Sequence, residues 1–137
     1  MRLLICGDRN WDDRGTIKAA IQELQPKVVI EGEARGADRL AGEEAEALGV
    51  PVLRYPAMWR LFGKAAGAIR NGVMLEQGEP THVLAFHADI RHSKGTADML
   101  RQARLYGIPR ALVSGPGQAI QWTAGEGFGL AQRKETP

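Results

Sequence analysis

Five short apolar runs recur along the chain, and each is separated from the next by a longer, more polar segment. The runs predict strands at residues 3–6, 27–30, 52–55, 81–86 and 110–113. The first run, Leu-Leu-Ile-Cys, does not alternate between apolar and polar positions. Unbroken apolar runs of this kind are typical of strands that are buried on both faces of a sheet.

The polar segments between these runs carry apolar residues at helical spacing. Ile17, Ala20, Ile21 and Leu24 follow the i, i+3, i+4, i+7 pattern, after two aspartates that are good helix caps. Further helices are predicted at residues 37–48, 63–76 and 96–106. The helix at 63–76 contains two glycines that each cost about 1 kcal/mol relative to alanine, which indicates close packing or close approach of a ligand.

Alternation of strands and helices predicts an α/β fold. We expect a Rossmann-like, doubly wound, mainly parallel five-stranded sheet with helices on both faces. This domain should cover residues 1–113, followed by a Gly-rich, partly irregular C-terminal extension over residues 114–137. Within the extension, residues 120–122 are candidates for a short edge strand.

Composition narrows the class of protein only slightly. A formal net charge of +2 over 137 residues does not by itself indicate a nucleic-acid or membrane surface. Arginine greatly outnumbers lysine, which suits fixed anion sites, although GC-rich coding or a warm-growing source would give the same bias. Cys6 is the only cysteine, which excludes an internal disulfide. No run reaches membrane-spanning length and residues 1–5 are too short for a signal peptide, so we expect a cytoplasmic protein.

Clusters of Gly, Arg and Asp follow three of the predicted strands. They lie at residues 7–11, 31–38 and 93–98, and each precedes a predicted helix. In an open parallel sheet such clusters gather along the carboxyl edge of the strands, where ligands bind. Glycines allow close backbone approach, helix N-termini favour anions, and arginines add forked donors. The pattern therefore predicts a site for a small anionic ligand at this edge.

The first two clusters supply most of the candidate ligand-binding residues. Arg9 and Asn10 are candidate anion donors, and the Trp11 ring is a candidate stacking surface; alternatively Trp11 covers the core and Asp8 only shapes a turn. In the second cluster Arg35 is placed to pair with a phosphate. Asp38 is better explained as a favourable charge in the first turn of the helix. The candidates from both clusters are Gly7, Asp8, Arg9, Trp11, Gly32, Arg35 and Gly36.

Four more candidates come from the third and fourth predicted helices. Arg70 and Asn71 stand in a helix of small residues, where a ligand can come close. Gly95 and Thr96 open the next helix and predict either a phosphate cradle or a plain helix cap. For Trp59 and its neighbour Phe62, packing is the stronger interpretation and base stacking the weaker one.

The histidines do not form a recognised metal-binding pattern. His87, Asp89 and His92 lie in one loop, and their spacing matches no known ligand set. We expect them to be solvent-facing loop residues. The sequence therefore predicts no metal site and no cofactor.

A comparison of magnitudes indicates what the ligand contains. Two or three charge-assisted hydrogen bonds supply roughly 3–9 kcal/mol, whereas association costs roughly 4–15 kcal/mol in lost freedom. A bare phosphate would therefore bind weakly. A nucleobase stacked on Trp11 or Trp59 would add the missing area, so a nucleotide or nucleotide derivative is the economical prediction.

Four motifs, in this order, closely resemble the YspA-like domains of the SLOG superfamily. They are residues 7–11, 31–38, 65–71 and 95–99, and the similarity extends to about residue 113. The resemblance implies a Rossmann-like sheet that binds nucleotides or nucleotide-derived signals. The superfamily includes the Lonely Guy phosphoribohydrolases, which cut the base from a nucleoside monophosphate, and DNA-processing protein A, which binds single-stranded DNA. Its members often pair, which implies a homodimer.

The Lonely Guy pattern carries over to this sequence only in part. Arg70 is similar to its helix arginine, and Gly95-Thr96 to its Gly-Thr loop. Its catalytic glutamate falls at Met99, and Asp98, one position earlier, points about 100° away on a helix. A methionine cannot stabilise an oxocarbenium ion or pass a proton.

Three functions remain, in this order. The first is a module that binds or senses a nucleotide-derived small molecule, with phosphate on Arg9, Arg35, Arg70, Gly95 and Thr96. The second is an N-glycosidic hydrolase in which Asp98 or Glu31 is the acid. The third is single-stranded nucleic-acid binding along the same basic edge, and no membrane partner is expected.

Overall fold

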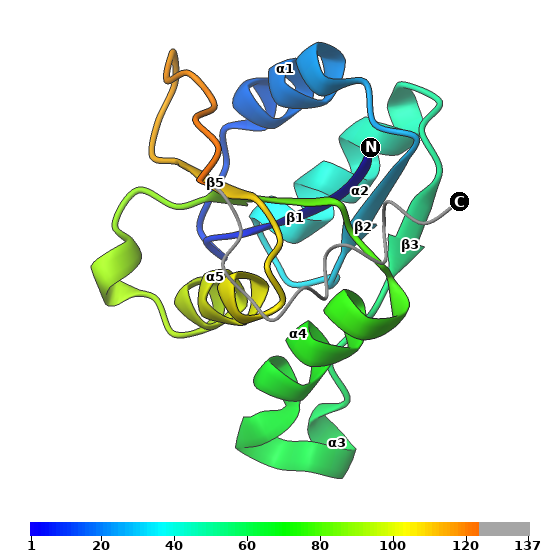
Figure 1. The fold of residues 1–137 in the computed structure, drawn as a ribbon, viewed down its shortest axis with the longest axis vertical. Coiled ribbons are helices and arrows are strands. Elements are labelled where there is room, and N and C mark those ends of the chain that lie inside the picture. Colours follow the sequence, from blue (N-terminus) through cyan, green and yellow to red (C-terminus); the bar gives the residue numbers. More distant parts are fainter. Residues whose placement is uncertain (124–137) are drawn as a thin grey trace.

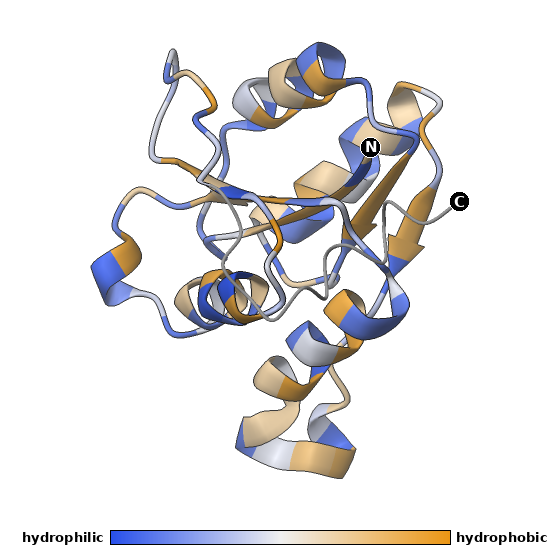
Figure 2. Cartoon of the chain, viewed as in Figure 1, coloured by the Kyte–Doolittle hydropathy of each residue, from blue (hydrophilic) through white to orange (hydrophobic). Residues whose placement is uncertain are grey.

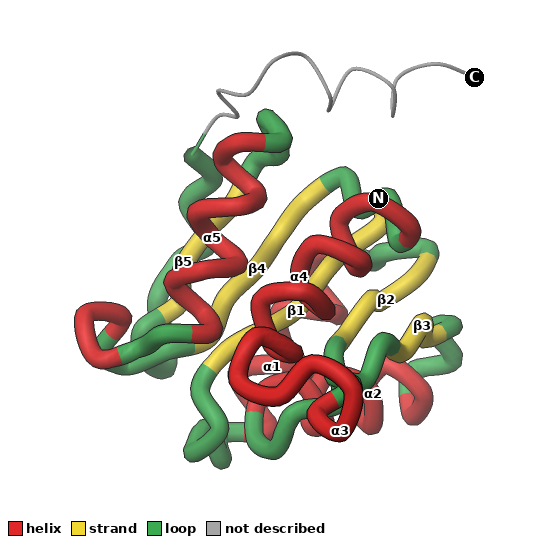
Figure 3. The backbone as a smooth tube through the Cα atoms, turned by 90° about the horizontal axis from the view of Figure 1, so that it is seen from below, coloured by secondary structure: helices red, strands yellow, loops and turns green. Residues whose placement is uncertain are grey.

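A computed structural model describes residues 1–123 and contains one five-stranded parallel sheet. The strands lie side by side in the order β3-β2-β1-β4-β5 (Figure 3). Leu3 of the central strand pairs with Val29 on one side and with His82 on the other. The strands are β1 (Arg2–Gly7), β2 (Val28–Glu31), β3 (Val52–Arg54), β4 (His82–Phe86) and β5 (Arg110–Val113). The chain thus builds outward from β1 in one direction and then in the other, as the predicted doubly wound topology requires.

Helices cover both faces of the sheet (Figure 1). On one face lie α1 (Arg14–Leu24) and α2 (Ala37–Ala47), and on the other lie α4 (Ala66–Gln77) and α5 (Gly95–Leu105). The short helix α3 (Trp59–Phe62) projects from the body of the molecule (Figure 1). Two turns of 3₁₀ helix, η1 (Gly63–Ala65) and η2 (Ile90–His92), complete the elements. The expected fold class, with helices on both faces, is confirmed.

Each face of β1 contributes to a separate hydrophobic core because successive side chains point to opposite faces of a strand. Leu3 and Ile5 pack with α1 and α2, whereas Leu4 and Cys6 pack with α4 and α5. All four are at least 94% buried, with 0–6% of their surface exposed. Figure 2 shows the strands as some of the most hydrophobic parts of the chain. The unbroken apolar run at residues 3–6 is therefore buried on both faces of the sheet, as the sequence predicted.

The helix predicted at residues 63–76 is shorter in the structure and is preceded by two separate turns. Gly63 has a φ of +57°, so the chain breaks direction between α3 and η1 before α4 begins. A Cβ on Gly67 would lie 3.6 Å from the Trp59 ring, and one on Gly72 would lie 3.3 Å from Gln102. The two helical glycines thus stand against neighbouring side chains, as their energetic cost suggested.

The described part of the C-terminal extension packs against the domain. Ile120 and Trp122 contact the α1–α2 core, and the rings of Trp122 and His82 lie 4.8 Å apart. Instead of a strand at residues 120–122, the structure has one antiparallel bridge between Thr123 and Arg110. The rest of the predicted extension, residues 124–137, lies outside the described residues. Over residues 1–123, no helix has both the length and the apolar character that a membrane crossing needs.

Candidate functional site

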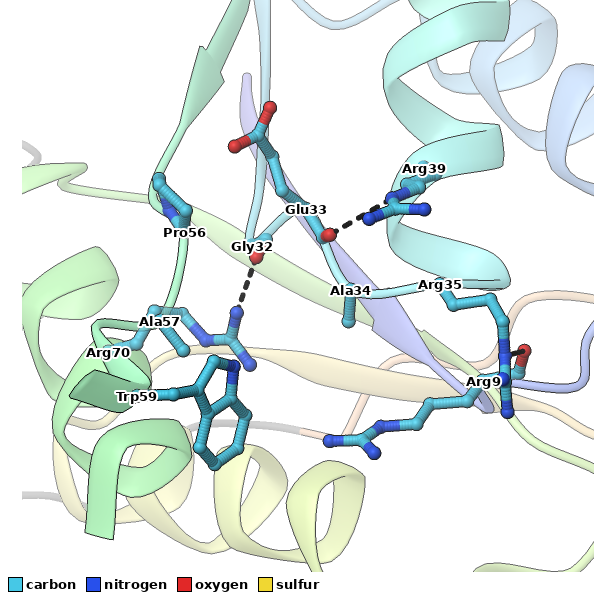
Figure 4. Close-up of a pocket in the computed structure, with 10 residues that line it drawn as sticks. All are labelled: Arg9, Gly32, Glu33, Ala34, Arg35, Arg39, Pro56, Ala57, Trp59 and Arg70. Atoms are coloured by element: carbon cyan, nitrogen blue, oxygen red, sulfur yellow. Dashed lines mark hydrogen bonds between the residues drawn. The ribbon is translucent and has the colours of Figure 1, made fainter. Parts of the chain in front are cut away.

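A pocket of about 590 Å³ lies at the carboxyl ends of β1, β2 and β3 (Figure 4). Arg9 comes from the loop after β1, Arg35 and Arg39 come from the loop after β2 and the start of α2, and Arg70 comes from α4. The three arginines predicted from the sequence therefore line one pocket. The remaining lining residues are Gly32, Glu33, Ala34, Pro56, Ala57 and Trp59.

The loop after β1 is anchored by its own backbone. The amide of Asp8 donates to the carbonyl of Phe86 at the end of β4, over 2.8 Å. The carbonyl of Asp8 accepts from the amides of Trp11 and Ala37, both at 3.1 Å, and its carboxylate accepts from the Asn10 amide at 2.9 Å. A Cβ on Gly7 would lie 2.2 Å from the Phe86 carbonyl. The loop is therefore held against the end of β4, and the Arg9 side chain extends toward Trp59 (Figure 4).

Gly36 brings the loops after β1 and β2 into direct backbone contact. Its φ of +83° is a conformation that side chains rarely adopt, and an added Cβ would lie 2.3 Å from the carbonyl oxygen of Asp8. The same contact is held by Arg35, whose Nε donates to the carbonyl of Arg9 at 3.2 Å. Gly36 thus contributes to the site by letting two loops meet.

Arg70 reaches the pocket from α4, on the opposite side from Arg35 and Arg39 (Figure 4). One terminal nitrogen of its guanidinium donates to the carbonyl of Gly32, and its Nε donates to Oδ1 of Asn71 at 3.1 Å. A Cβ on Gly32 would lie 2.4 Å from Arg70, so a glycine is needed for this approach. Asn71 is itself buried and donates to the Gly95 carbonyl at 3.2 Å and to Asp98 at 3.0 Å.

Four arginines outside the pocket are paired with carboxylates, whereas Arg2 is held by the carbonyls of Gly78 and Glu79. Arg14, Arg54, Arg91 and Arg101 each lie within 4.0 Å of a carboxylate oxygen. No carboxylate among residues 1–123 lies that close to the four pocket arginines, which are Arg9, Arg35, Arg39 and Arg70.

Backbone carbonyls hold three of these four side chains. Arg39 donates to the carbonyl of Glu33 at 3.2 Å, in the same manner as Arg35 and Arg70. The guanidinium of Arg9 makes no hydrogen bond within the described residues and lies 5.9 Å from the centroid of the Trp59 ring. Carbonyl groups orient a guanidinium without neutralising it, so four guanidinium groups line the pocket against one carboxylate, that of Glu33.

Two buried carboxyl groups lie behind the pocket wall. Burial raises the pKa of Asp38 to about 6, against the opposing effects of Arg70 and of the amides of Ala34 and Gly32. Burial likewise raises the pKa of Glu31 to about 7. Glu31 is 1% exposed; it accepts from the Glu33 amide and lies 3.7 Å from Arg54. Asp38 is thus more than a favourable charge in the first helical turn. Its carboxyl group also accepts from the amides of Ala34 and Gly32, which lie in the loop that lines the pocket.

Several predicted residues lie apart from the pocket. Trp11 is 9% exposed, donates its indole N–H to the Asp13 carbonyl, and packs its ring 5.6 Å from that of Phe86. Of the two interpretations that the sequence allowed for Trp11, stacking on a base or covering the core, the structure shows the second. The amide of Thr96 donates to the hydroxyl of Ser93 at 3.0 Å, so a side chain caps α5, and Gly95 and Thr96 do not line the pocket.

The two candidate acids for a hydrolase do not line the pocket either. The carboxylate of Asp98 accepts from Asn71, from Gln102 at 2.7 Å and from Arg101. Glu31 is occupied by the Glu33 amide, as described above. Both groups serve the architecture around the pocket.

One histidine expectation is wrong. His87 is 8% exposed, and its Nδ1 accepts from the amide of Asp89 at 3.0 Å. Its Nε2 lies 4.0 Å from the carboxylate of Asp8, so the imidazole fills the space between the loops after β1 and β4. His87 is buried although it lies in a loop, because the loops after β1 and β4 meet around its ring. No group of three or more potential metal ligands occurs among residues 1–123.

Among the charged and aromatic side chains of the pocket, sequence reasoning missed Glu33 and Arg39, and it gave base stacking only as the weaker interpretation of Trp59. Arg39 stands in the first turn of α2, directly after the predicted anion-binding cluster, and this position was the signal that could have found it. Trp59 was assigned mainly to packing, but half of its surface is exposed at the pocket. Its position depends on the contact of α3 with α4, where the Trp59 ring lies against Gly67, an arrangement that local spacing does not encode.

The fold and site define a Rossmann-like α/β protein with a basic pocket at the carboxyl edge of its sheet. The chain belongs to the YspA, cpYpsA-related SLOG family (YAcAr), whose model matches residues 1–62. It is 38% identical over 118 residues to the Gene 61 protein of Mycobacterium phage D29. The matched region covers 79% of this chain and 92% of that protein.

A solved structure has the same fold. The X-ray structure of DNA processing protein A (DprA) from Streptococcus pneumoniae is similar with a TM-score of 0.68 at 16% sequence identity. The match covers 84% of this chain and 50% of that one, so the chain spans half the length of this structural relative.

Proposed function

We propose that this protein binds a nucleotide-derived small molecule in the arginine-lined pocket. Arg9 and Arg70 would hold phosphate oxygens, and the base would stack on Trp59, which lies beside both in Figure 4. The observation that carries the proposal is the charge of the pocket: four arginines line it, and no carboxylate of residues 1–123 is paired with any of them. An anion supplies the missing partner.

The energetics favour a ligand that is larger than phosphate. Two or three charge-assisted hydrogen bonds from Arg9 and Arg70 supply roughly 3–9 kcal/mol, which does not exceed the association cost by itself. Stacking on an aromatic ring adds about 1–3 kcal/mol per base. Trp59 is half exposed and lies within cation–π distance of Arg9, so a base and a phosphate would be bound side by side.

The positions of the two candidate acids, Asp98 and Glu31, favour binding or sensing over hydrolysis. General acid catalysis needs a carboxyl group within hydrogen-bond reach of the leaving group. Asp98 and Glu31 do not line the pocket, and the carboxyl group of each accepts hydrogen bonds from the protein itself. We therefore propose a binding module, with turnover of nucleoside monophosphates as the finding that would replace it by a hydrolase.

Titration calorimetry with the four nucleoside diphosphates and the matching monophosphates tests the proposal. Arg70→Ala and Arg9→Ala should each weaken the best ligand by about tenfold or more. Arg91→Ala is the matched control, because it removes an exposed arginine of η2 that lies outside the pocket. Equal losses in all three variants would indicate a general charge effect, and unchanged affinity in Arg70→Ala would reject the site.

One observation favours single-stranded nucleic acid as a second candidate. Phe62 is 41% exposed on α3, close in sequence to Trp59, and the same segment carries Arg60 and Lys64. Exposed aromatics with interleaved cations are typical of single-strand binding surfaces. Oligonucleotide binding that weakens steeply with salt and is reduced by Phe62→Ala would favour this candidate, because Phe62 does not line the pocket.

A further inference from the structure

One peptide unit in the wall of the pocket connects a buried acid to a pocket arginine. Its carbonyl, from Gly32, accepts from Nη1 of Arg70, and its amide, from Glu33, donates to the carboxyl group of Glu31. Glu31 is 1% exposed and is the last residue of β2. The two ends of a trans peptide point in opposite directions. The acid and the arginine therefore lie on opposite sides of the same piece of backbone.

The next peptide unit repeats this arrangement with a second acid and a second arginine. Its carbonyl, from Glu33, accepts from Nε of Arg39 at 3.2 Å, and its amide, from Ala34, donates to Oδ2 of Asp38 at 3.3 Å. Figure 4 shows the two arginines reaching this backbone from α2 and α4. We call residues 32–34 the loop partition, because they separate two buried acids from two arginines of the pocket.

Asp38 and Arg70 also approach the same backbone position directly. A Cβ added to Gly32 would lie 2.4 Å from Nη1 of Arg70 and 2.9 Å from Oδ2 of Asp38. Asp38 is 4% exposed, so water screens its charge only weakly. An ionised Asp38 therefore compensates part of the Arg70 charge, which a protonated Asp38 does not.

Both acids change charge close to neutral pH. Burial is the largest influence on each of them, and it raises the pKa of Asp38 to about 6 and that of Glu31 to about 7. The charged and titratable groups that face the two acids, besides each other, are Cys6 of β1, Arg9 of the loop after it, Glu33, Arg54 of β3 and Arg70 of α4.

Ionisation of the acids and binding of an anion make opposite demands on the arginines. An ionised carboxyl group accepts more strongly than a protonated one, and it polarises the peptide so that the carbonyl on the other side holds its guanidinium more strongly. It also attracts the guanidinium charge through space. A proton on the acid removes both effects and leaves the guanidinium more available to a ligand.

We propose that the loop partition couples the pocket to protons: protonation of Glu31 and Asp38 favours binding of an anion on the pocket arginines, and their ionisation opposes it. This inference rests on the proposed function and describes the regulation of the same site. By linkage, binding of the anion favours protonation of the two acids to the same extent. Affinity is therefore highest at mildly acidic pH and falls as the pH rises through neutrality.

Calorimetry of the full chain at about pH 5.5 and about pH 8 tests the coupling, with ADP, GDP, CDP and UDP as probes. The reference is the double variant Glu31→Gln, Asp38→Asn, in which neither position changes charge. Ionisation of the ligand and of the other protein groups is common to both proteins, so the difference between them reports the two acids. Relative to the double variant, the wild type should lose about tenfold in affinity between the lower and the higher pH.

Glu44→Gln is the matched control. It changes a buried carboxyl group of the same helix that pairs with Arg14 and lies outside the pocket, and it should keep the wild-type profile. Equal profiles in the wild type and the double variant would overturn the inference, while binding itself would leave the proposed function standing. Failure of all four diphosphates to bind at either pH would overturn the proposed function together with this inference.

A measurement on the wild type alone decides the matter if the double variant does not fold. Carbon-13 NMR follows the titration of the Glu31 and Asp38 carboxyl groups, with and without saturating diphosphate. The ligand should raise their titration midpoints by about one pH unit, which corresponds to a tenfold coupling. Midpoints that are unchanged or lower in the complex would overturn the inference.

Discussion

The side chains of Arg70 and Asn71, consecutive on α4, are hydrogen bonded to each other: Nε of the arginine donates to Oδ1 of the asparagine at 3.1 Å. Asn71 is 4% exposed and donates in turn to the carbonyl of Gly95 and to Asp98. Arg70 meanwhile reaches the carbonyl of Gly32. A buried amide thus connects α5 to the arginine that enters the pocket from α4.

Asn71→Ala should weaken nucleotide binding about tenfold and lower the free energy of unfolding by about 1–3 kcal/mol. The substitution removes the amide that donates to the Gly95 carbonyl and to Asp98, and it frees the Arg70 guanidinium. Calorimetry and urea unfolding measure the two effects. Gln77→Ala, an exposed amide at the end of the same helix, is the control. Full affinity in Asn71→Ala would show that Arg70 needs no positioning.

Gly36→Ala should destabilise the protein by several kcal/mol more than Gly49→Ala does. Both glycines have positive φ, +83° and +78°, so both substitutions carry a conformational cost of about 1–3 kcal/mol. The ψ of −128° adds to this cost at Gly36. An added Cβ also meets the Asp8 carbonyl at 2.3 Å at Gly36 and nothing within 4 Å at Gly49. The difference between the two melting curves measures the special backbone of Gly36 together with its contact to the other loop, and equal losses would contradict the prediction.

Trp59→Ala should weaken nucleotides by about 5- to 100-fold and leave the affinity for inorganic pyrophosphate nearly unchanged. The range corresponds to stacking of one base, which pyrophosphate lacks. Phe62→Ala removes a comparably exposed aromatic of the same helix outside the pocket and should affect neither ligand. A parallel loss of pyrophosphate binding in Trp59→Ala would assign the indole to positioning Arg9 instead.

Glu31→Gln should flatten the pH dependence of stability. The pKa of Glu31 is raised from its ordinary value of 4.5 to about 7, so the folded state holds the proton after the unfolded state has lost it. Stability therefore falls as pH rises between these values, by at most about 3 kcal/mol. Urea unfolding at about pH 5 and about pH 8 should show a smaller fall in Glu31→Gln than in the wild type. The exposed Glu23→Gln should behave like the wild type, and an identical fall in Glu31→Gln would contradict the raised pKa.

Cys6 should be unreactive toward a thiol reagent in the folded protein and reactive after unfolding in urea. Burial, and then the neighbouring Asp38 carboxylate, raise the pKa of this thiol above its usual range. Because the chain has one cysteine, the absorbance change reports this position alone. Rapid reaction of the folded protein at neutral pH would show that the α4–α5 side of the core opens.

Local pattern was sufficient for most of the fold. The apolar runs and helical stripes predicted the strands and the covering helices, because the burial of a strand or of one helix face fixes the spacing of apolar residues within a short segment. The same reasoning failed at residues 59–65, where a glycine at +57° interrupts a segment that otherwise has helical composition. It also failed for His87, whose burial depends on a loop from another strand.

The sequence by itself determined which segments become strands and helices, and that glycines and arginines gather at the carboxyl ends of the strands. Tertiary structure alone decided that Arg39 joins Arg9, Arg35 and Arg70 around one pocket, and that Trp59 lies beside them while Trp11 enters the core. The physical reason is range. Propensity and periodicity act within a few residues, whereas the direction of a side chain at a strand end depends on backbone contacts between loops that are distant in the chain, such as Gly36 against Asp8.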